Sequence, residues 1–193
     1  AVGADKVYNA LANASVVLSS EDILDGDEIT LGGTASFTDE NVGTDKTINV
    51  SSISITGGAD MGNYALDNTT AAATADITQK PITATVTAED KIYDGTTSAT
   101  ITGRALVDVI PGDIVTANED GTATFTDANA AVGKVVSATG ITIIGADALN
   151  YNYDGTATGA ADITPLGITG SFTADNKVYD GGAVATVLTQ SLT

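Results

Sequence analysis

The sequence predicts an all-β protein in which small β-sandwich domains follow one another in an elongated rod. Three observations indicate this fold class. Apolar and polar residues alternate with a period of two, turn-forming dipeptides recur about every ten residues, and the whole pattern returns after about 86 residues. Thr, Val and Ile are also frequent, and their branched side chains suit the pleated, half-buried surface of a strand.

The repeat is clearest in three tyrosines, Tyr8, Tyr93 and Tyr179, which are spaced by 85 and 86 residues. The stretch 35–66 (ASFTDENVGTDKTINVSSISITGGADMGNYAL) likewise aligns with 123–153. Because the phase shifts only at expected loops, the repeating unit is one whole domain. The predicted domains are a first repeat over 1–81 that lacks part of its opening strand, a second repeat over 82–167, and the opening of a third over 168–193.

Strands are expected over 48–55 (INVSSISI), 82–88 (ITATVTA) and 139–145 (TGITIIG), where apolar residues alternate with Thr, Ser or Asn. Turns are expected at dipeptides such as Gly57-Gly58, Asp94-Gly95, Pro111-Gly112 and Asp154-Gly155. The stretches 20–24 (SEDIL) and 104–110 (RALVDVI) are the exceptions, and each is expected to form one helical turn.

Many short strands at regular spacing are typical of an immunoglobulin-like sandwich, and a β-grasp-like mixed fold is the alternative. No Gly/Ser-rich or Pro-rich linker separates the repeats, because the closing "ADIT" is followed within four residues by the "IT" that opens the next unit. We therefore expect a stiff rod in which each repeat contacts its neighbours in the chain. The incomplete opening strand of the first repeat leaves an edge that could pair with a second copy of the chain.

The Tyr-Asp-Gly motif lies between two alternating stretches, where Asp-Gly supplies the positive φ values of a tight hairpin turn. We interpret it as a corner of the fold, with the Tyr93 ring against its own domain and its hydroxyl on a backbone carbonyl. A catalytic or sugar-stacking pair is the alternative reading. The first repeat has Asn9 and Ala10 after its tyrosine, so a different turn shape is expected there. The structural positions of the motif are Tyr8, Tyr93, Asp94, Gly95, Tyr179, Asp180 and Gly181.

Composition excludes several classes of function. The chain has 7 Lys and Arg against 25 Asp and Glu, a net charge of −18, and such a surface repels nucleic acid and anionic lipid. Cys and His are absent, which removes disulfides, thiol nucleophiles, Ser-His-Asp triads and the usual zinc sites. No apolar run is long enough to span a membrane and no signal peptide opens the chain, so we expect no membrane insertion and a segment of a longer protein.

Four short motifs characterise the repeat: the opening "KIYDGTT", the central "FTDxN" followed by "VG", the "GAD" with "NY", and the closing "ADIT". Together they resemble the YDG-type repeats of large bacterial surface and secreted adhesins, which often occur beside similar MBG-type repeats. The resemblance covers both repeats and the third opening, and departs from the pattern at "YNA" in the first repeat and "NAAVG" in the second. It implies an extracellular stalk or spacer module with no catalytic residues.

The sequence predicts no cofactor, and calcium is the one metal that Asp-rich loops could ligate. The loop 22–29 (DILDGDEI) lacks the spacing of a complete EF-hand loop, and the second repeat keeps only part of it. Solvated carboxylates that keep the rod soluble are the simpler reading. The candidate calcium ligands are Asp25, Asp27, Glu28, Asp90 and Asp175.

Two further sets of residues recur with the repeat. Lysines return at 6, 91 and 177, and again at 46 and 134, where surface ion pairs are expected and a Lys–Asn amide cross-link is the alternative. Asn63-Tyr64 and Asn150-Tyr151 each follow a Gly-Ala-Asp, and we expect Tyr64 and Tyr151 to pack inward rather than to stack on a sugar.

Together these observations predict that the chain is not an enzyme and that it provides length and stiffness to an extracellular adhesin or surface fibre. One alternative is a module that binds a glycan or a protein through loops at one end of the sandwich. The other is a filament subunit that assembles by exchanging strands with its neighbours.

Overall fold

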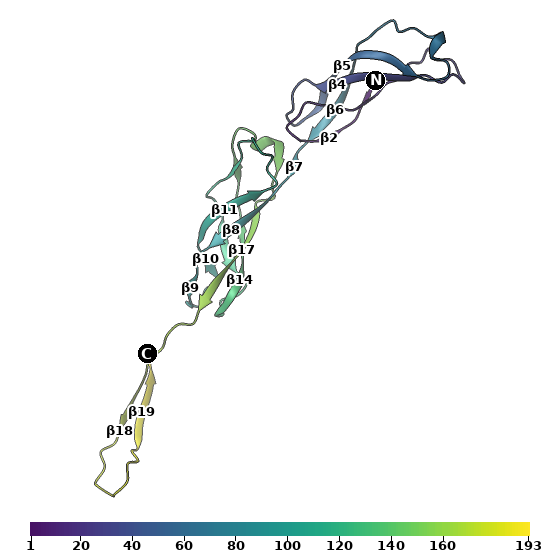
Figure 1. Ribbon diagram of the computed structural model, residues 1–193. Coiled ribbons are helices and arrows are strands. Elements are labelled where there is room, and N and C mark those ends of the chain that lie inside the picture. The colour runs from purple at the N-terminus through teal and green to yellow at the C-terminus, as the bar shows by residue number, and fades with distance from the viewer.

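The computed structural model describes residues 1–193 and shows an elongated molecule (Figure 1). Two β domains follow one another along its length, and a separate β-hairpin forms the far end. The only helical elements are two single 3-10 turns, η1 (Met61–Asn63) and η2 (Ala148–Asn150). The fold is therefore all-β and sandwich-like, and the mixed β-grasp-like alternative, which requires an α-helix, is wrong.

The first domain contains a four-stranded sheet in the order β2-β6-β5-β4, with a separate pair of strands, β1 and β3. β2 runs parallel to β6, and the other pairs in the sheet are antiparallel. The strands are β1 (Val2–Gly3), β2 (Lys6–Val7), β3 (Val16–Val17), β4 (Thr30–Phe37), β5 (Gly43–Gly57) and β6 (Ala71–Thr78).

The second domain contains a seven-stranded sheet in the order β10-β13-β14-β17-β8-β11, with β9 also paired to β17. Because β10 and β11 at the two edges are almost continuous in sequence, the sheet folds round on itself. The main strands are β8 (Thr83–Ala88), β9 (Lys91–Ile92), β10 (Ser98–Ala99), β11 (Ile101–Val107), β13 (Thr122–Phe125), β14 (Ala131–Thr139) and β17 (Thr156–Thr164). The shorter ones are β7 (Lys80–Pro81), which leads into the domain, β12 (Thr116–Ala117), β15 (Ile143–Ile144) and β16 (Tyr151–Asn152).

The hairpin consists of β18 (Gly170–Ala174) and β19 (Val187–Leu192), and it lies beyond the second domain without a covering sheet (Figure 1). Its pairing of Ala174 with Val187 matches the pairing of Ala88 with Ile101 in the second domain. The hairpin is thus equivalent to β8 and β11 of a complete repeat, and its apolar side chains are exposed.

The cores are thin, since only 20 of 193 residues are buried. In β5 and β14, buried residues alternate with exposed ones, as the period of two predicts. Ile48 and Val50 fill the first core, and Val136 and Ala138 fill the second. Such cores need only small and branched side chains, which explains the scarcity of aromatic residues.

The two predicted helical turns are wrong. Residues 20–24 form a non-helical turn, and residues 104–107 belong to β11, where they pair with β8. The 3-10 turns occur instead after Gly58 and Gly145, at the "GAD" motif. The pairing of 104–107 with a neighbouring strand overrides the local preference of this apolar run.

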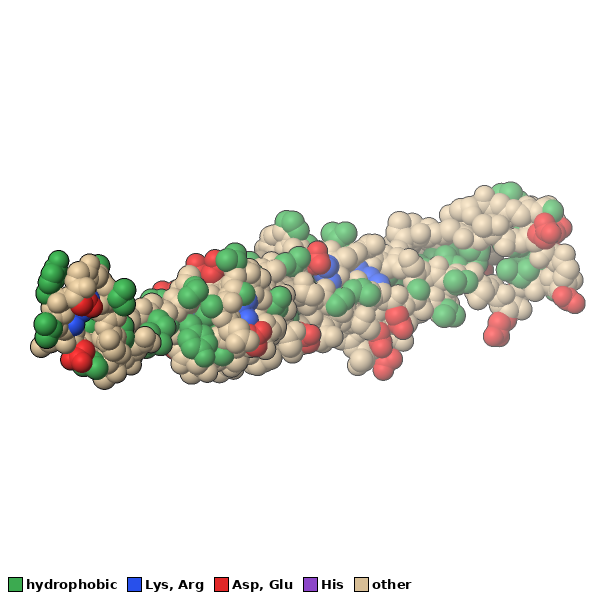
Figure 2. Space-filling model, turned by 90° about the horizontal axis from the view of Figure 1, so that it is seen from below, with side chains coloured by type: hydrophobic (Ala, Val, Ile, Leu, Met, Phe, Trp, Pro, Cys, Tyr) green, Lys and Arg blue, Asp and Glu red, His purple; other side chains and the backbone are tan.

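The surface is acidic along its whole length. Figure 2 shows Asp and Glu side chains at intervals along the visible face, with few Lys or Arg side chains and with apolar side chains between them. None of the helical elements is long or apolar enough to cross a membrane.

Candidate functional site at the joint between repeats

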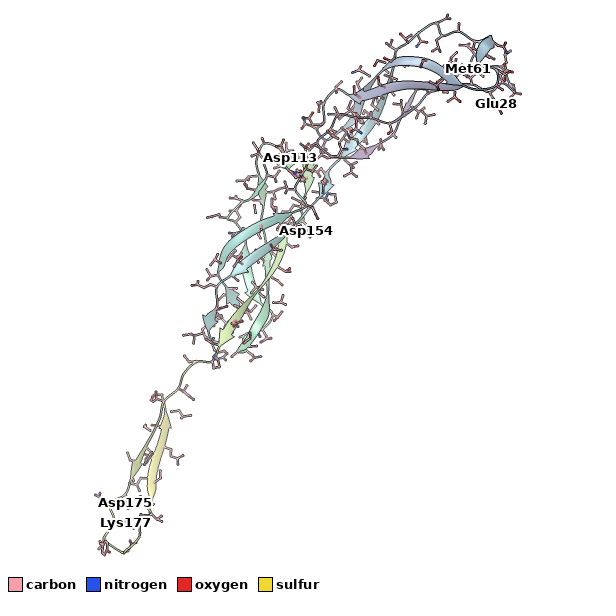
Figure 3. All side chains as sticks on the ribbon, viewed as in Figure 1. Glu28, Met61, Asp113, Asp154, Asp175 and Lys177 are labelled. Carbon is pink, nitrogen blue, oxygen red and sulfur yellow. The ribbon has the colours of Figure 1, made fainter.

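The contact between the two repeats is built around one carboxylate. Tyr8, which follows β2, and Tyr151, which begins β16, both donate their hydroxyls to Oδ2 of Asp113, at 2.9 and 2.5 Å. Their ring centroids lie 5.5 Å apart in an edge-to-face arrangement, and the two residues are only 3% and 2% exposed. Figure 3 shows Asp113 at the end of the second domain that faces the first. Tyr8 therefore buries its phenol in the next repeat rather than in its own.

Side-chain amides bridge the same two ends. The Val42 amide donates to Oδ1 of Asn150 at 3.0 Å, and Nδ2 of Asn150 donates to Oδ1 of Asn41 at 3.1 Å. Nε2 of Gln79 donates to the Leu149 carbonyl at 3.0 Å. Asn150 is 4% exposed and is the one buried polar residue of the chain. Both its amide oxygen and its amide nitrogen are hydrogen-bonded. These bonds offset the cost of burial, because a buried amide without partners would be strongly destabilising.

We call the residues that the first repeat contributes to the joint the tyrosine face (Tyr8, Asn41, Val42 and Gln79). The residues that the second repeat contributes are the carboxylate face (Asp113, Leu149, Asn150 and Tyr151). The chain between them is also fixed. β7 pairs in parallel with β16, and the Ile82 amide donates to the Asn152 carbonyl at 3.0 Å. Ile82 and Tyr151 belong to the same buried cluster as Tyr8 and the first-domain core. One apolar core therefore continues across the joint.

The environment of the joint keeps both phenols neutral. Burial, together with the hydrogen bond to the Asp113 carboxylate, raises the pKa of Tyr151 to about 12. The same two causes raise the pKa of Tyr8 far above its ordinary value. A phenolate beside Asp113 would place two negative charges in a poorly solvated site, so the joint requires the protonated hydroxyls.

The "GAD" motif brings the carboxylate face together. Oδ2 of Asp147 accepts the Ile114 amide at 2.8 Å, and Gly145, at φ +134, lies so close to Ile114 that an added Cβ would be 2.0 Å from its carbonyl oxygen. The chain can then turn through η2 and place Asn150 and Tyr151 beside Asp113. The first repeat has the same arrangement, with Gly58, Asp60 and Glu28.

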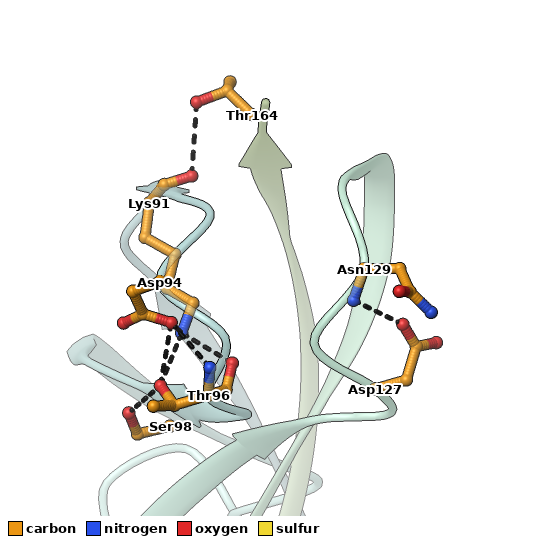
Figure 4. Close-up of polar contacts among 7 residues, drawn as sticks. All are labelled: Lys91, Asp94, Thr96, Ser98, Asp127, Asn129 and Thr164. Atoms are coloured by element: carbon orange, nitrogen blue, oxygen red, sulfur yellow. Dashed lines mark hydrogen bonds and ion pairs between the residues drawn. The ribbon is translucent and has the colours of Figure 1, made fainter. Parts of the chain in front are cut away.

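The Tyr-Asp-Gly loop is a corner locked by a lysine (Figure 4). Oδ1 of Asp94 accepts the Thr96 amide and the Lys91 ammonium, each at 2.8 Å, and Lys91 also donates to the Thr96 carbonyl at 2.9 Å. The ammonium lies 5.6 Å from the centre of the Phe125 ring, and Gly95 has φ +77. The lysine holds the pKa of Asp94 down to about 2, by its hydrogen bond first and the Thr96 amide second.

The predicted tight hairpin is wrong. β9, before the motif, pairs with β17, whereas β10, after it, pairs with β13. The expected hydroxyl bond of Tyr93 to a carbonyl of its own domain is also wrong, since Tyr93 is 40% exposed and its hydroxyl has no partner. Its backbone is fixed by the bond from its amide to the Thr164 carbonyl, at 2.8 Å, while the side chain is not part of the buried cluster of the second domain.

The loop of the first repeat keeps the same shape, against expectation. Ala10 has φ +57 and takes the conformation of Gly95. Lys6 donates to Oδ1 of Asn9 at 2.9 Å and to the Asn13 carbonyl at 3.0 Å. Because Asn9 provides no negative charge, burial lowers the pKa of Lys6. Thus a lysine can hold this loop even with an amide in place of the aspartate.

The other predicted site residues are spread along the molecule. Tyr64 donates to Oδ2 of Asp27 at 2.7 Å and accepts the Leu24 amide at 2.9 Å, at the free end of the first domain. Asp25 and Glu28 are exposed near this end. In the hairpin, Tyr179 is 92% exposed, while Lys177 pairs with Asp180, ahead of Gly181.

The calcium candidates are not brought together. Oδ1 of Asp90 accepts the Asp162 amide at 2.7 Å, and Asp175 lies at the tip of the hairpin (Figure 3). No group of three or more acidic side chains is placed to hold a metal ion. The recurring lysines pair with aspartates, as in Lys46 with Asp39 and Lys134 with Asp127, and only Lys6 faces asparagines.

A surface depression of about 530 Å³ lies on the hairpin between Phe172, Val187 and Leu192. The equivalent strands of the second domain are covered by the rest of its sheet, so this depression is an uncovered core face and has no convergent polar groups. The joint remains the most elaborate polar site of the molecule.

Sequence reasoning identified Tyr8 and Tyr151 but not their meeting across the joint, and it missed Asn41, Asn150 and Gln79 as contacts. One feature of the sequence could have indicated that the Asp113 carboxylate has a structural role. Asp27 and Asp113 occupy the same repeat position although their neighbours differ, which indicates a role beyond solubility.

The model of the YDG domain family matches the chain twice, over residues 1–72 and 78–159. No curated protein and no solved structure matches the chain. The two matched segments coincide with the two domains on either side of the joint, and together they cover most of the sequence. The chain therefore belongs to the YDG domain family.

Proposed function

We propose that this chain is a stalk or spacer segment of an extracellular bacterial adhesin or surface fibre, to which it gives length and stiffness. The observation that carries the proposal is the burial of Tyr8 in the carboxylate face of the next repeat. A linker held by strand pairing and a core that continues across the joint restrict bending between repeats. A long, stiff, acidic array is what a protein needs to carry a terminal domain away from a surface.

The alternatives have less support from the geometry. Tyr151 is 2% exposed, so its ring is not available to stack on a sugar. No group of three or more His, Cys, Asp or Glu side chains is placed to hold a metal ion. Strand exchange would use the exposed hairpin, and removing residues 171–193 should then weaken self-association.

Two measurements test the proposal. Small-angle scattering of the chain should give a maximum dimension close to that of the extended molecule in Figure 1, whereas a compact or flexible particle contradicts a stalk. Antibodies raised against the chain should label intact cells of the organism that produces it. Labelling only after permeabilisation contradicts an extracellular location.

A further inference from the structure

We propose that the two unpaired ends of this chain are the two halves of the same joint, and that each is a docking surface for the opposite end of another YDG repeat. This inference rests on the proposed function, and extends it from one observed contact to the assembly of the whole array. The observed joint supplies the template, because each of its main residues has a counterpart at a free end.

The free end of the second domain carries a tyrosine face. Tyr93, Asn129, Ala130 and Pro165 occupy the repeat positions of Tyr8, Asn41, Val42 and Gln79. They line a shallow depression of about 380 Å³ together with Leu166 and Ile168. Figure 4 shows Asn129 at the same end of the domain as the lysine-locked loop. The Ala130 amide makes no hydrogen bond, whereas its counterpart, the Val42 amide, is bound to Asn150.

The free end of the first domain carries a carboxylate face. Asp27, Gly62, Asn63 and Tyr64 occupy the repeat positions of Asp113, Leu149, Asn150 and Tyr151. Tyr64 already donates to Asp27 and accepts the Leu24 amide, as Tyr151 does with Asp113 and Ile110. Half of the joint is thus preformed before a partner arrives. Figure 3 places Glu28 and Met61 at this free end.

The apolar surroundings correspond as well. Around the occupied joint, Val109, Val115 and Tyr153 pack against the cluster that contains Tyr8. Their counterparts, Ile23, Ile29 and Leu66, line a depression of about 190 Å³ next to Tyr64. Both the polar acceptor and the apolar wall that receive Tyr8 in the observed joint are therefore present at the free end. The occupant with matching chemistry is the tyrosine face of a preceding repeat.

The test gives each face the partner that it lacks. In one extended chain, residues 82–167 are duplicated in tandem after Gly167, so that the first copy's Tyr93 meets the second copy's Asp113. In the other, residues 82–171 precede Ala1, which completes the opening strand of the first repeat and presents Tyr93 to Asp27. The linker spacing of the observed joint, from Thr78 to Ile82, is kept in both.

Hydrogen exchange of the Ala130 amide is the readout. In the chain of 193 residues this amide should exchange without protection, while the Val42 amide is protected. In both extended chains, the Ala130 amide that faces the new joint should slow by at least about tenfold. Tyr93→Ala in that copy should abolish the protection, whereas Tyr93→Ala in the original chain should leave the exchange of Ala130 unchanged.

If the facing Ala130 amide exchanges in both extended chains as it does in the original chain, while Val42 stays protected, the proposal is wrong. The proposed function would survive that result, because the joint centred on Tyr8 would still be closed. Loss of Val42 protection in the original chain would instead contradict the stiff joint on which the proposed function depends. Protection in only one extended chain would restrict docking to the corresponding face and overturn the claim that both ends are docking surfaces.

Discussion

The same tyrosine of the repeat has three different environments in this chain. Tyr8 is 3% exposed, Tyr93 is 40% exposed and Tyr179 is 92% exposed. The repeat to which each tyrosine belongs does not determine this difference in exposure, because the lysine-locked loop is formed in all three repeats. What differs is whether a carboxylate face lies beyond the tyrosine. The burial of this residue therefore reports whether a joint is closed.

Tyr8→Phe removes the hydroxyl but keeps the ring in the joint. We expect a loss of about 1 to 2 kcal/mol of joint stability, because Asp113 loses one donor to a charged acceptor. Denaturant unfolding with probes in each domain measures this. Tyr93→Phe is the matched control, because its hydroxyl has no partner, and it should change stability by less than about 0.5 kcal/mol. Equal effects of the two substitutions would contradict the assigned role of Tyr8.

High pH should open the joint. Folding raises the pKa of Tyr8 and Tyr151, so the stability that they provide is complete below the pKa of an unfolded tyrosine, about 10. It is then lost progressively as the pH rises towards the folded value of Tyr151, about 12. Ultraviolet titration of tyrosinate, combined with scattering at each pH, checks this. Complete ionisation of all tyrosines near pH 10 with an unchanged rod would contradict the account.

At the scale of the structural element, the corner loop shows how one motif tolerates variation. Its essential parts are a lysine that binds carbonyls of the loop, an Asx side chain and a residue at positive φ. Asn9 and Ala10 satisfy the last two requirements less well than Asp94 and Gly95. The loop closes nevertheless because Lys6 also reaches the Asn13 carbonyl.

Restoring the motif in the first repeat should stabilise that domain. Asn9→Asp supplies a counter-charge to Lys6, worth at most about 1 kcal/mol in an exposed loop. Ala10→Gly removes the cost of positive φ for a residue with a Cβ, about 1 kcal/mol, part of which is offset by the greater freedom of unfolded Gly. Thermal unfolding of the double variant should show a higher midpoint for the first domain only. A lower midpoint would mean that the loop is not strained as described.

The tight approach at the "GAD" motif gives an opposite prediction. Gly58 has φ +110, and an added Cβ would lie 2.0 Å from the Glu28 carbonyl oxygen. Gly58→Ala should therefore destabilise the first domain by more than about 2 kcal/mol. Gly62→Ala is the control, since nothing lies within 4 Å of its added Cβ and its φ is not positive. Chemical denaturation should separate the two variants clearly, and similar midpoints would show that the loop can relax.

The elements could be predicted from the sequence to the extent that a local pattern determines them. The alternation in β5 and β8 identified strands, and repetition identified the units. The strand predicted over 139–145 is mostly wrong, since Thr139 ends β14 and only Ile143–Ile144 forms a short strand, β15. Residues 104–107 were misread as helical because their pairing with β8 is not visible locally. The loop around Asp94 was misread as a hairpin because its flanking strands pair with distant partners, β17 and β13.

At the scale of the whole molecule, stiffness depends on contacts that span the repeat boundary. Their partners are far apart in sequence, as with Tyr8 and Asp113, so no local pattern reveals them. The absence of a flexible linker in the sequence indicated the rod, but it did not indicate the side chains that close the joint. The acidic surface adds to extension, since like charges along the rod disfavour folding back or lateral association.

The orientation of the two domains in solution tests the central claim most directly. Residual dipolar couplings of backbone amides can be measured separately for residues 6–78 and 83–164. The account predicts that one alignment tensor fits both domains in the native chain, and that Tyr8→Ala gives each domain its own tensor. Different tensors for the two domains of the native chain would mean that the repeats move independently and that the joint is not stiff.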